Sequence, residues 1–327
     1  MEIIFKNTLE KYDLLRKKAK LILGVSGGPD SVYMLYQFLK IAKDYKLQLV
    51  CVHFNHSLRE EADAEEEFIR KLCLRLKVKF ISEKKDVQSF FNGNSLEQTA
   101  RNLRLDFFMK VSRQTKIKKI ALAHHKDDLA ETVLMRMIRG SGLKGLRGFL
   151  PKTKFRSLTV IRPLVEIRKK DIIKWLEEKK IPFCTDKSNF EDKFFRNKVR
   201  LKLLPLLKEL NPNVVSNLNN LASNVSLDYD FIYSFSYEKF LSIKRKETSN
   251  GICLDLKGLV ILSPAIFNNV VRIAIEELKG NTRRLEAKHL DELRDLIFKR
   301  PKGSVVDLPE IIVKKEEKTL LIQSLIL

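Results

Sequence analysis

ILGVSGGPDSVYM, residues 22–34, decides the fold of this chain. An apolar run breaks into a short polar turn and then resumes with apolar residues at helical spacing, which predicts a strand, a loop and a helix. Gly27 and Gly28 allow positive φ angles and a close approach of the backbone to a ligand. Free N–H groups at the start of the helix attract anions, so the turn predicts a phosphate-binding loop. Pro29 follows the last glycine, where a Walker loop carries lysine, which excludes a Walker-type kinase or GTPase.

The sequence on either side of this turn alternates between short apolar runs and amphipathic segments of helical length. Strands are predicted at residues 20–25, 47–53, 78–81 and 120–123. This βαβ pattern predicts an α/β fold with a Rossmann-like, doubly wound parallel sheet. Ligands of such sheets bind beyond the carboxyl ends of the strands. Polar residues follow the first, second and fourth strands, so we expect one crevice to contain Ser26, His53 and His124.

The pattern changes after Pro151, where shorter strands and longer helices follow one another. Helices are predicted at 168–180, 194–210, 213–245, 264–279 and 286–299, and strands at 159–161, 304–307, 311–315 and 319–324. We therefore expect a first domain over residues 1–212, a linking helix over 213–245 and a second, smaller α+β domain over 246–327.

The positive charge of the chain is concentrated in one segment. The formal net charge is +22 over 327 residues, and residues 101–215 contain 29 Lys and Arg against 12 Asp and Glu. Neutralisation of phosphates by basic side chains releases counterions, so such a segment indicates a polyanion such as nucleic acid as a partner. A solvated lysine-rich surface is the alternative interpretation.

Targeting signals and cysteine clusters are not expected. The first 20 residues are charged throughout and no apolar run approaches the length of a membrane span, which predicts a cytoplasmic protein with neither signal peptide nor membrane helix. The four cysteines contain no C-x-x-C pair. We expect reduced thiols rather than a disulfide scaffold, a zinc ribbon or an iron–sulfur site.

A second chemical motif is AHHKDDLAET, residues 123–132. His125, Asp128 and Glu131 recur at i, i+3 and i+6 just past a predicted strand. Such a set suits Mg²⁺ binding, general-base work or capture of an ammonium group, and a helix cap with hydrogen-bonded histidines is the alternative. The apolar residues of this helix fall on another face, so we expect its carboxylates to be free for chemistry.

Three further segments carry polar residues suited to a nucleotide or to RNA. HFNHSLR, residues 53–59, follows a buried strand and could contact adenine, ribose or RNA. SLEQTARNLR, residues 95–104, places Glu97, Arg101 and Arg104 at the spacing of a surface ion pair, and its guanidinium groups would also suit phosphates. Residues 139–148 are glycine-rich and basic, as is typical of a mobile loop that closes on a polyanion.

Together these motifs resemble those of the tRNA(Ile)-lysidine synthases, a family of PP-loop (N-type) ATP pyrophosphatases. The resemblance runs in order over roughly residues 20–205 and rests on SGGPDS, HFNHSLR, the 97–104 segment, AHHKDDLAET with RGSG, Arg162-Pro163-Leu164, and the polar residues at 186–189 before Arg196-Asn197. The remainder is similar to the small second domain of this family. Two alternatives are a PP-loop tRNA thiolase, many of which need clustered cysteines, and a catalytically inactive tRNA-binding protein.

The resemblance implies ATP-dependent ligation of lysine to C2 of the wobble cytidine of a tRNA(Ile) with a CAU anticodon. The cytidine would be adenylated with release of pyrophosphate, and lysine would then displace AMP to form lysidine, which changes codon reading from Met to Ile. ATP and Mg²⁺ are the implied cofactors. The implied partners are the tRNA, recognised in part by the second domain, and free L-lysine, without a membrane or an obligate protein partner.

The resemblance also implies roles for individual residues. ATP would be held by Ser26, Gly27, Gly28, Pro29, Asp30, Ser31 and His53, and Mg²⁺ by Asp30 and Asp128. Catalysis would fall to Asp30, Arg101, His125, Asp128, Glu131 and Arg196. The base that deprotonates the lysine amine would be one of Asp128, Glu131 and His125. RNA would be contacted by Arg139, Lys144, Arg147 and Arg200.

Overall fold

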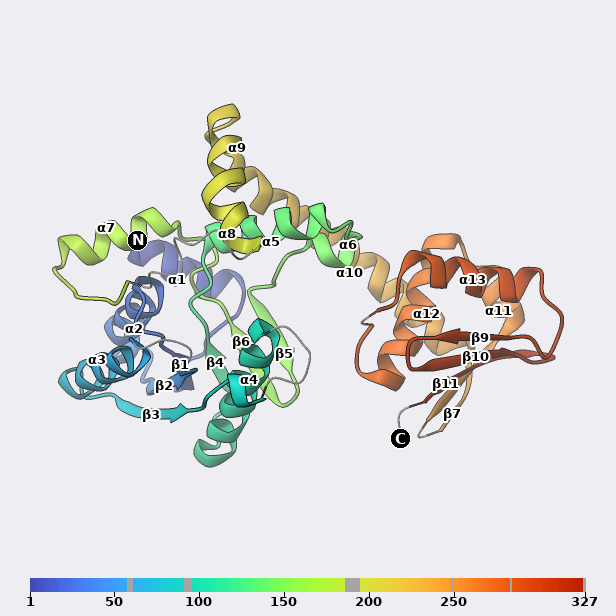
Figure 1. Ribbon diagram of the computed structural model, residues 1–327, viewed down its shortest axis with the longest axis horizontal. Helices are drawn as coiled ribbons and strands as arrows, with labels where there is room; N and C mark the ends of the chain where they lie inside the picture. The colour runs from blue at the N-terminus through green and yellow to red at the C-terminus, as the bar shows by residue number, and fades with distance from the viewer. Residues whose placement is uncertain (58–60, 91–95, 186–194, 249, 283, 326–327) are drawn as a thin grey trace. The chain divides into compact units, whose positions relative to one another are not determined.

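The computed structural model divides the chain into two compact units, Met1–Ser223 and Asn224–Leu327 (Figure 1). It describes residues 1–327 except 58–60, 91–95, 186–194, 249, 283 and 326–327. The parts of the predicted motifs at 58–59, 95 and 186–189, the predicted helix start at 194 and the side chain of Glu97 therefore lie outside the described residues.

Unit 1 is built on a six-stranded sheet in the order β3-β2-β1-β4-β6-β5. Its parallel strands are β1 (Lys20–Gly24), β2 (Gln48–Asn55), β3 (Lys79–Lys84), β4 (Lys119–Ala121) and β6 (Leu158–Ile161). The register pairs Gly24 with Val52, so β2 continues three residues beyond the end of β1. The predicted doubly wound sheet is confirmed. The antiparallel edge strand β5 (Lys152–Phe155) was not predicted, because its short sequence KTKF contains little apolar signal.

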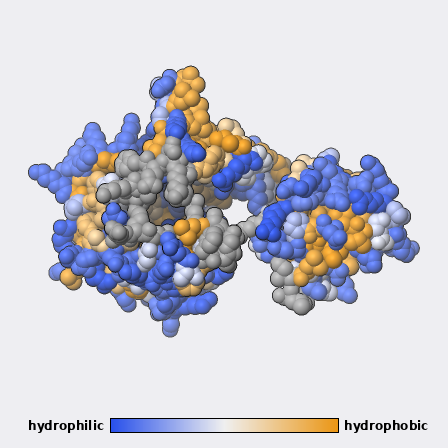
Figure 2. All heavy atoms as spheres, viewed as in Figure 1, coloured by the Kyte–Doolittle hydropathy of each residue, from blue (hydrophilic) through white to orange (hydrophobic). Residues whose placement is uncertain are grey.

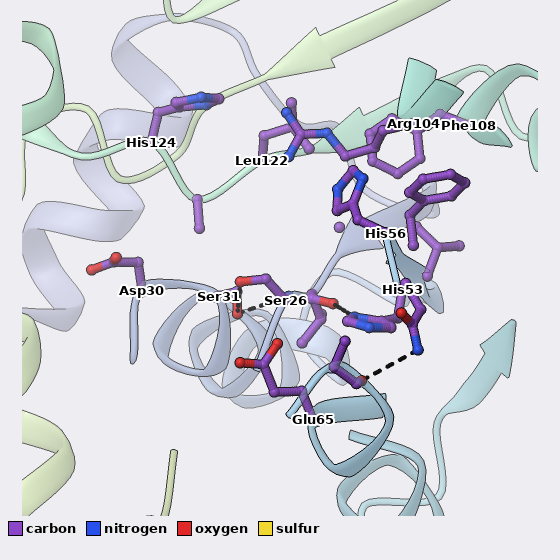
Figure 3. Close-up of a pocket in the computed structure, with 17 residues that line it drawn as sticks. Ser26, Asp30, Ser31, His53, His56, Glu65, Arg104, Phe108, Leu122 and His124 are labelled. Atoms are coloured by element: carbon purple, nitrogen blue, oxygen red, sulfur yellow. Dashed lines mark hydrogen bonds between the residues drawn. The ribbon is translucent and has the colours of Figure 1, made fainter. Parts of the chain in front are cut away.

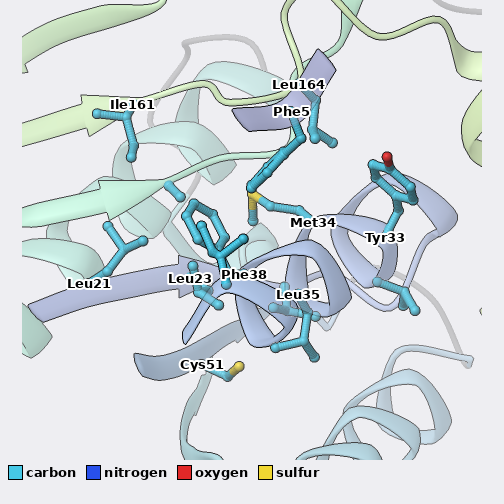
Figure 4. Packing of buried hydrophobic residues seen from close by; sticks show 14 of the residues in the cluster. Phe5, Leu21, Leu23, Tyr33, Met34, Leu35, Phe38, Cys51, Ile161 and Leu164 are labelled. Atoms are coloured by element: carbon cyan, nitrogen blue, oxygen red, sulfur yellow. The ribbon is translucent and has the colours of Figure 1, made fainter. Parts of the chain in front are cut away.

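Successive residues of a strand point to opposite faces of the sheet, and each face is covered by its own apolar layer. On one face, Leu21 and Leu23 pack with helices α1 (Glu2–Lys11), α2 (Pro29–Ala42), α3 (Ala62–Arg75) and α7 (Lys169–Glu178) (Figure 4). On the other face, Ile22 packs with α4 (Leu96–Thr115). A short 3₁₀ turn, η1 (Gln88–Phe90), precedes α4. Helices on both faces leave the carboxyl edge of the sheet as the place for a ligand.

The second half of unit 1 is helical and follows the sheet edge. Its elements are α5 (Lys126–Ile138), α6 (Leu143–Leu146), α8 (Phe195–Lys198), the π-helical turn η3 (Val199–Leu203), α9 (Leu204–Leu210) and the start of α10 (Val214–Ile243). The basic helix predicted over 194–210 thus contains a π turn. Pro205 has no N–H to donate to the carbonyl four residues earlier, and the N–H of Leu204 donates to Val199 O, five residues earlier. Hydrophobic side chains gather over α9, where Leu206 and Leu210 are exposed (Figure 2).

Unit 2 contains a five-stranded antiparallel sheet in the order β7-β8-β11-β10-β9. The strands are β7 (Lys244–Thr248), β8 (Gly251–Asp255), β9 (Val305–Leu308), β10 (Ile311–Lys315) and β11 (Thr319–Ser324). Helices α11 (Leu256–Val260), α12 (Pro264–Lys279) and α13 (Ala287–Phe298) share one apolar core with the sheet. The predicted α+β character of this region is confirmed.

The sequence predicts neither disulfide bonds nor membrane-spanning helices. The four cysteines, all within the described residues, are free thiols in the structure. Among the helices described, none combines the length and apolar character that a membrane span requires.

Candidate active site

A cavity of about 380 Å³ opens at the carboxyl edge of the unit 1 sheet (Figure 3). It is lined by residues that follow or end β1, β2 and β4, among them Ser26, His53 and His124. The predicted convergence of these three segments is confirmed. Phe54 and Phe108 are among the lining residues; Phe108 lies with Arg104 and His56 at one end of the cavity, and Asp30 lies at the other end with its carboxylate directed away from them (Figure 3).

The predicted phosphate loop is a turn held by the hydroxyl of Ser31. This hydroxyl donates to Gly28 O (2.9 Å) and accepts from the backbone N–H of Ser26 (3.1 Å). Gly28 is the N-cap of α2, and Pro29 occupies the first turn, where its missing N–H costs nothing. Of the two glycines, Gly27 adopts a positive φ of 87°, whereas Gly28 has a φ of −68°.

Gly27 is also fixed by the chain segment that follows α7. The Cys184 backbone N–H donates to Gly27 O (2.9 Å), and a Cβ added at Gly27 would lie 3.3 Å from Cys184 Sγ. A Cβ added at Gly28 would meet only Ser26 Oγ, at 3.6 Å. Gly27 is therefore required by the fold of the loop, whereas the space beside Gly28 stays open for a ligand.

Asp30, at the start of α2, has one oxygen engaged by the protein and one available to a ligand. Lys169 Nζ, from the first residue of α7, donates to Asp30 Oδ2 (2.6 Å). Among the described residues, Oδ1 is buried and has no hydrogen-bond partner, and the nearest imidazole nitrogen, His125 Nε2, is 3.8 Å away. Lys169 was not predicted as a site residue, because it lies 139 positions from Asp30 and belongs to no glycine-rich or clustered motif.

Metal binding at this place would depend on few protein ligands. No group of three or more His, Cys, Asp or Glu side chains in the described chain could hold a metal ion. Mg²⁺ next to phosphates is commonly bound by one or two carboxylates and the substrate itself, so the unengaged Oδ1 of Asp30 fits such a site. Asp128 fits less well, because both of its oxygens already accept hydrogen bonds.

His125 is the N-cap residue of α5 and exchanges hydrogen bonds with Asp128. The Asp128 N–H donates to His125 Nδ1 (3.2 Å), and the His125 N–H donates to Asp128 Oδ2 (3.0 Å), which is a capping box. The ring Nε2 lies 3.4 Å from Asp128 Oδ2. His125 therefore does cap the helix, as the alternative interpretation of this motif predicts. The same residue also faces Asp30.

The carboxylates of Asp128 and Glu131 are buried and paired with two arginines. Asp128 is 8% exposed and Glu131 is 2% exposed. Arg196 Nη2 donates to Asp128 Oδ1 (2.8 Å) and Arg196 Nε to Glu131 Oε2 (2.8 Å). Arg200 Nε donates to Glu131 Oε1 (2.7 Å) and Nη2 to Glu131 Oε2 (3.0 Å). We call these four residues the carboxylate–arginine quartet.

Two expectations concern the residues of the quartet. The carboxylates of α5 are not free, because α8 and η3 place a guanidinium on each of them, and the apolar stripe of α5 ends before Met137 and Ile138, which are exposed. Arg200, for which the resemblance implies an RNA contact, donates to Glu131. Burial opposes ionisation of Asp128, but attraction by His125 and Arg196 outweighs it and holds the pKa of this carboxyl well below its usual range.

Three histidines, His53, His56 and His124, line the cavity, and burial lowers the pKa of two of them. Burial lowers the pKa of His124 to about 3, and its ring packs 5.1 Å from that of Phe149. Burial also lowers the pKa of His53, although the hydrogen bond between its Nδ1 and Val25 O (2.9 Å) acts in the opposite direction. Neutral imidazoles of this kind suit contact with an uncharged ring better than contact with phosphate.

The basic residues predicted for catalysis and RNA binding lie at different places. On α4, Arg104 lines the cavity, whereas Arg101 is an exposed side chain outside its lining. Arg139 caps the end of α5 with its guanidinium 5.2 Å from the ring of Phe195. Lys144 is exposed on α6, and Arg147 at the end of α6 is half-buried.

Asp127 joins the two elements that face Asp30. Its Oδ2 accepts from the backbone N–H of Lys169 (2.8 Å), and its Oδ1 accepts from Arg168 Nε (3.3 Å). The Lys126 N–H donates to Ile167 O (2.9 Å) at the same junction. Asp127 was part of a predicted motif but had no predicted role.

This fold and site define the chain as a PP-loop protein. The PP-loop domain family matches residues 1–207, and the TilS substrate binding domain family matches residues 254–320. Among solved structures, the U34-tRNA thiolase NcsA from Methanococcus maripaludis is similar, with a TM-score of 0.58 and 19% identity over 68% of this chain and 78% of that chain. At this identity the likeness shows the fold alone.

The curated relatives identify the family within this class. A tRNA(Ile)-lysidine synthase of Clostridium tetani is 35% identical over 314 residues, which are 94% of this chain and 66% of the relative. One from Petrotoga mobilis is 32% identical over 323 residues, which are 98% of this chain and 97% of the relative. The chain spans about two thirds of the length of the clostridial relatives. It belongs to the tRNA(Ile)-lysidine synthase family.

Proposed function

We propose that this chain ligates free L-lysine to C2 of the wobble cytidine of a tRNA(Ile) with a CAU anticodon, at the expense of ATP. The observation that carries the proposal is that His125 joins the phosphate loop to the carboxylate–arginine quartet. Its Nε2 lies 3.8 Å from Asp30 Oδ1 and 3.4 Å from Asp128 Oδ2. A nucleotide site and a site suited to a cationic amine are thereby adjacent.

The first chemical step would form a bond between cytidine O2 and the α-phosphorus of ATP and break the bond to the β-phosphate. Ser26, Ser31 and the backbone of the glycine turn would bind and orient the phosphates, and His53, Phe54 and Phe108 would surround the base. When bound, Mg²⁺ would neutralise phosphate charge, and Asp30 is the residue that would hold it. Adenylation turns a poor leaving group into AMP.

The second step would form the bond between the lysine ε-nitrogen and C2 and break the bond between C2 and the adenylated oxygen. An ammonium group cannot attack, so a base among Asp128, Glu131 and His125 would first take its proton. A lysine side chain that replaces part of the contact between Arg196 and Asp128 would satisfy the same carboxylate oxygens. Arg196 would then be released toward the AMP phosphate.

tRNA would be bound by both units. We assign its backbone contacts in unit 1 to Arg139, Lys144 and Arg147, of which Arg139 and Lys144 are exposed. Discrimination between tRNAs is assigned to the domain over 246–327, which contains the match to the substrate-binding family, with the 213–245 helix as its link to the 1–212 domain. We place the reaction in the cytoplasm, where tRNA is found, and it involves no obligate protein partner.

The test is incubation of the full chain with labelled lysine, ATP and a tRNA(Ile) transcript with a CAU anticodon. We expect label in the tRNA together with equal amounts of AMP and pyrophosphate, and no label with a transcript in which the wobble cytidine is uridine. ADP as the main product would refute the proposed chemistry. Binding of tRNA without ATP cleavage would favour the inactive tRNA-binding protein, and incorporation of sulfur from a donor would favour the thiolase.

A further inference from the structure

The phosphate loop lacks the lysine of a Walker loop, but the fold supplies a lysine from elsewhere in the chain. Lys169 Nζ lies 2.6 Å from Asp30 Oδ2, directly beside the start of α2. Lys169 is the first residue of α7, and its side chain is 34% exposed. The ammonium group therefore lies beside Asp30, a residue that lines the cavity, on a side chain that is partly exposed.

The position of Lys169 is fixed through its backbone rather than through its side chain. Asp127 Oδ2 accepts from the Lys169 N–H (2.8 Å), and Asp127 belongs to the first turn of α5. His125, one residue before α5, faces the other oxygen of Asp30. The same junction between α5 and α7 thus aims an ammonium and an imidazole at one carboxylate.

The cavity indicates which part of ATP would reach Lys169. Phe108 lies with the imidazoles of His53 and His56 and with Arg104 at the end far from Asp30, and Ser26 and Ser31 of the phosphate loop lie nearer to Asp30 (Figure 3). With adenine at the far end, the phosphate chain would pass Asp30 and extend toward Lys169. The carboxylate of Asp30 alone would repel this anion, so a cation is needed beside it.

We propose that Lys169 is the phosphate-binding lysine of this site. It pairs with Asp30 in the protein without nucleotide and binds the β- and γ-phosphates when ATP enters, which frees Asp30 Oδ2. It then holds the pyrophosphate that departs after adenylation. This inference rests on the proposed function for the identity of the leaving group, but the binding of ATP by Lys169 is measurable without tRNA or lysine.

The experiment measures dissociation constants of ATP, AMP and pyrophosphate by calorimetry on the full chain, with Mg²⁺ present. The variants are Lys169→Ala, Lys169→Arg and, as a matched control, Lys170→Ala, which removes the same charge from an exposed neighbour. We expect Lys169→Ala to weaken ATP and pyrophosphate binding by roughly 10- to 100-fold, as for loss of one hydrogen bond to a charged group, and to leave AMP binding within about twofold. Lys169→Arg retains the charge and recovers part of the loss, and Lys170→Ala binds as the wild type does.

Equal affinities of Lys169→Ala and wild type for ATP and pyrophosphate would overturn the inference. An equal loss for AMP would also overturn it, because a general distortion of the site does not distinguish phosphate groups. If Lys169→Ala does not fold, Lys169→Gln replaces it, since the amide still donates to Asp30 without the charge. If the wild type binds ATP in this Lys169-dependent manner but forms no lysidine, the inference stands and the proposed function fails.

Discussion

Substitution of each glycine of the phosphate loop by alanine distinguishes the glycine that stability requires from the glycine that ligand binding requires. Gly27→Ala places a side chain at φ 87° with its Cβ 3.3 Å from Cys184 Sγ. Gly28→Ala places one at φ −68° with a single contact at 3.6 Å. We expect Gly27→Ala to lower the free energy of unfolding of unit 1 by about 1–2 kcal/mol and Gly28→Ala to raise it by about 0.4–1 kcal/mol through the unfolded chain.

The two variants should therefore differ by about 2 kcal/mol, which corresponds to roughly 4–8 °C in melting temperature for a unit of this size. Trp175 is the sole tryptophan of the chain and packs edge-to-face on Tyr33 at 5.1 Å, so its fluorescence follows the unfolding of unit 1. Gly28→Ala should nevertheless weaken ATP binding, because its Cβ enters the space left open for phosphate. Equal melting temperatures for the two variants, or unchanged ATP affinity in Gly28→Ala, would refute this division of roles.

Three further predictions concern the buried ion pairs, a buried histidine and the basic surface. Arg200→Ala removes hydrogen bonds from the buried carboxylate of Glu131 and should lower the free energy of unfolding of unit 1 by about 2 kcal/mol in urea unfolding. Lys198 is exposed, so Lys198→Ala should change the free energy of unfolding by less than about 0.5 kcal/mol. Burial lowers the pKa of His124 to about 3 in the folded chain, so the unfolded chain takes up the histidine proton at a higher pH than the folded chain does. The free energy of unfolding therefore falls as the pH drops below about 6.5. His124→Gln should reduce this fall by up to about 1.4 kcal/mol per pH unit between pH 6.5 and 4.5. Arg139→Ala with Lys144→Ala should reduce the slope of log tRNA affinity against log salt by about 0.7–0.9 for each phosphate that is no longer neutralised, and an unchanged slope in a filter-binding titration would remove them from the RNA surface.

The sheet and its ligand-binding edge could be predicted because they depend on local signals. Apolar runs of strand length locate β1, β2 and β10, and parallel connection then requires Ser26, His53 and His124 to meet at one edge. Strand β5 was missed because its sequence is polar and it gains its apolar contacts only by pairing with β6. The π turn before Pro205 was missed because it depends on how individual carbonyls are satisfied.

Motifs predicted which segments meet at the carboxyl edge of the sheet, but not which side chains pair with one another across motifs. His125, Asp128 and Glu131 are brought together by one helix and could be recognised by their spacing. Their arginine partners come from a segment about 70 residues later, and the partner of Asp30 comes from α7, 139 residues later. Such pairings are set by tertiary packing, and a lysine in a basic sequence such as residues 168–170 has no local feature that distinguishes it from its neighbours.

The cap of α5 has a consequence for the direction of proton transfer. A neutral imidazole has a single nitrogen lone pair, and the one on His125 Nδ1 accepts the Asp128 N–H (3.2 Å). The proton of the neutral ring is therefore on Nε2, the nitrogen that faces Asp30 and the Asp128 side chain. In this tautomer His125 donates toward the nucleotide and cannot accept a proton there unless the first turn of α5 opens. We therefore expect His125 to act as a hydrogen-bond donor of the site, which favours Asp128 or Glu131 among the three proposed bases.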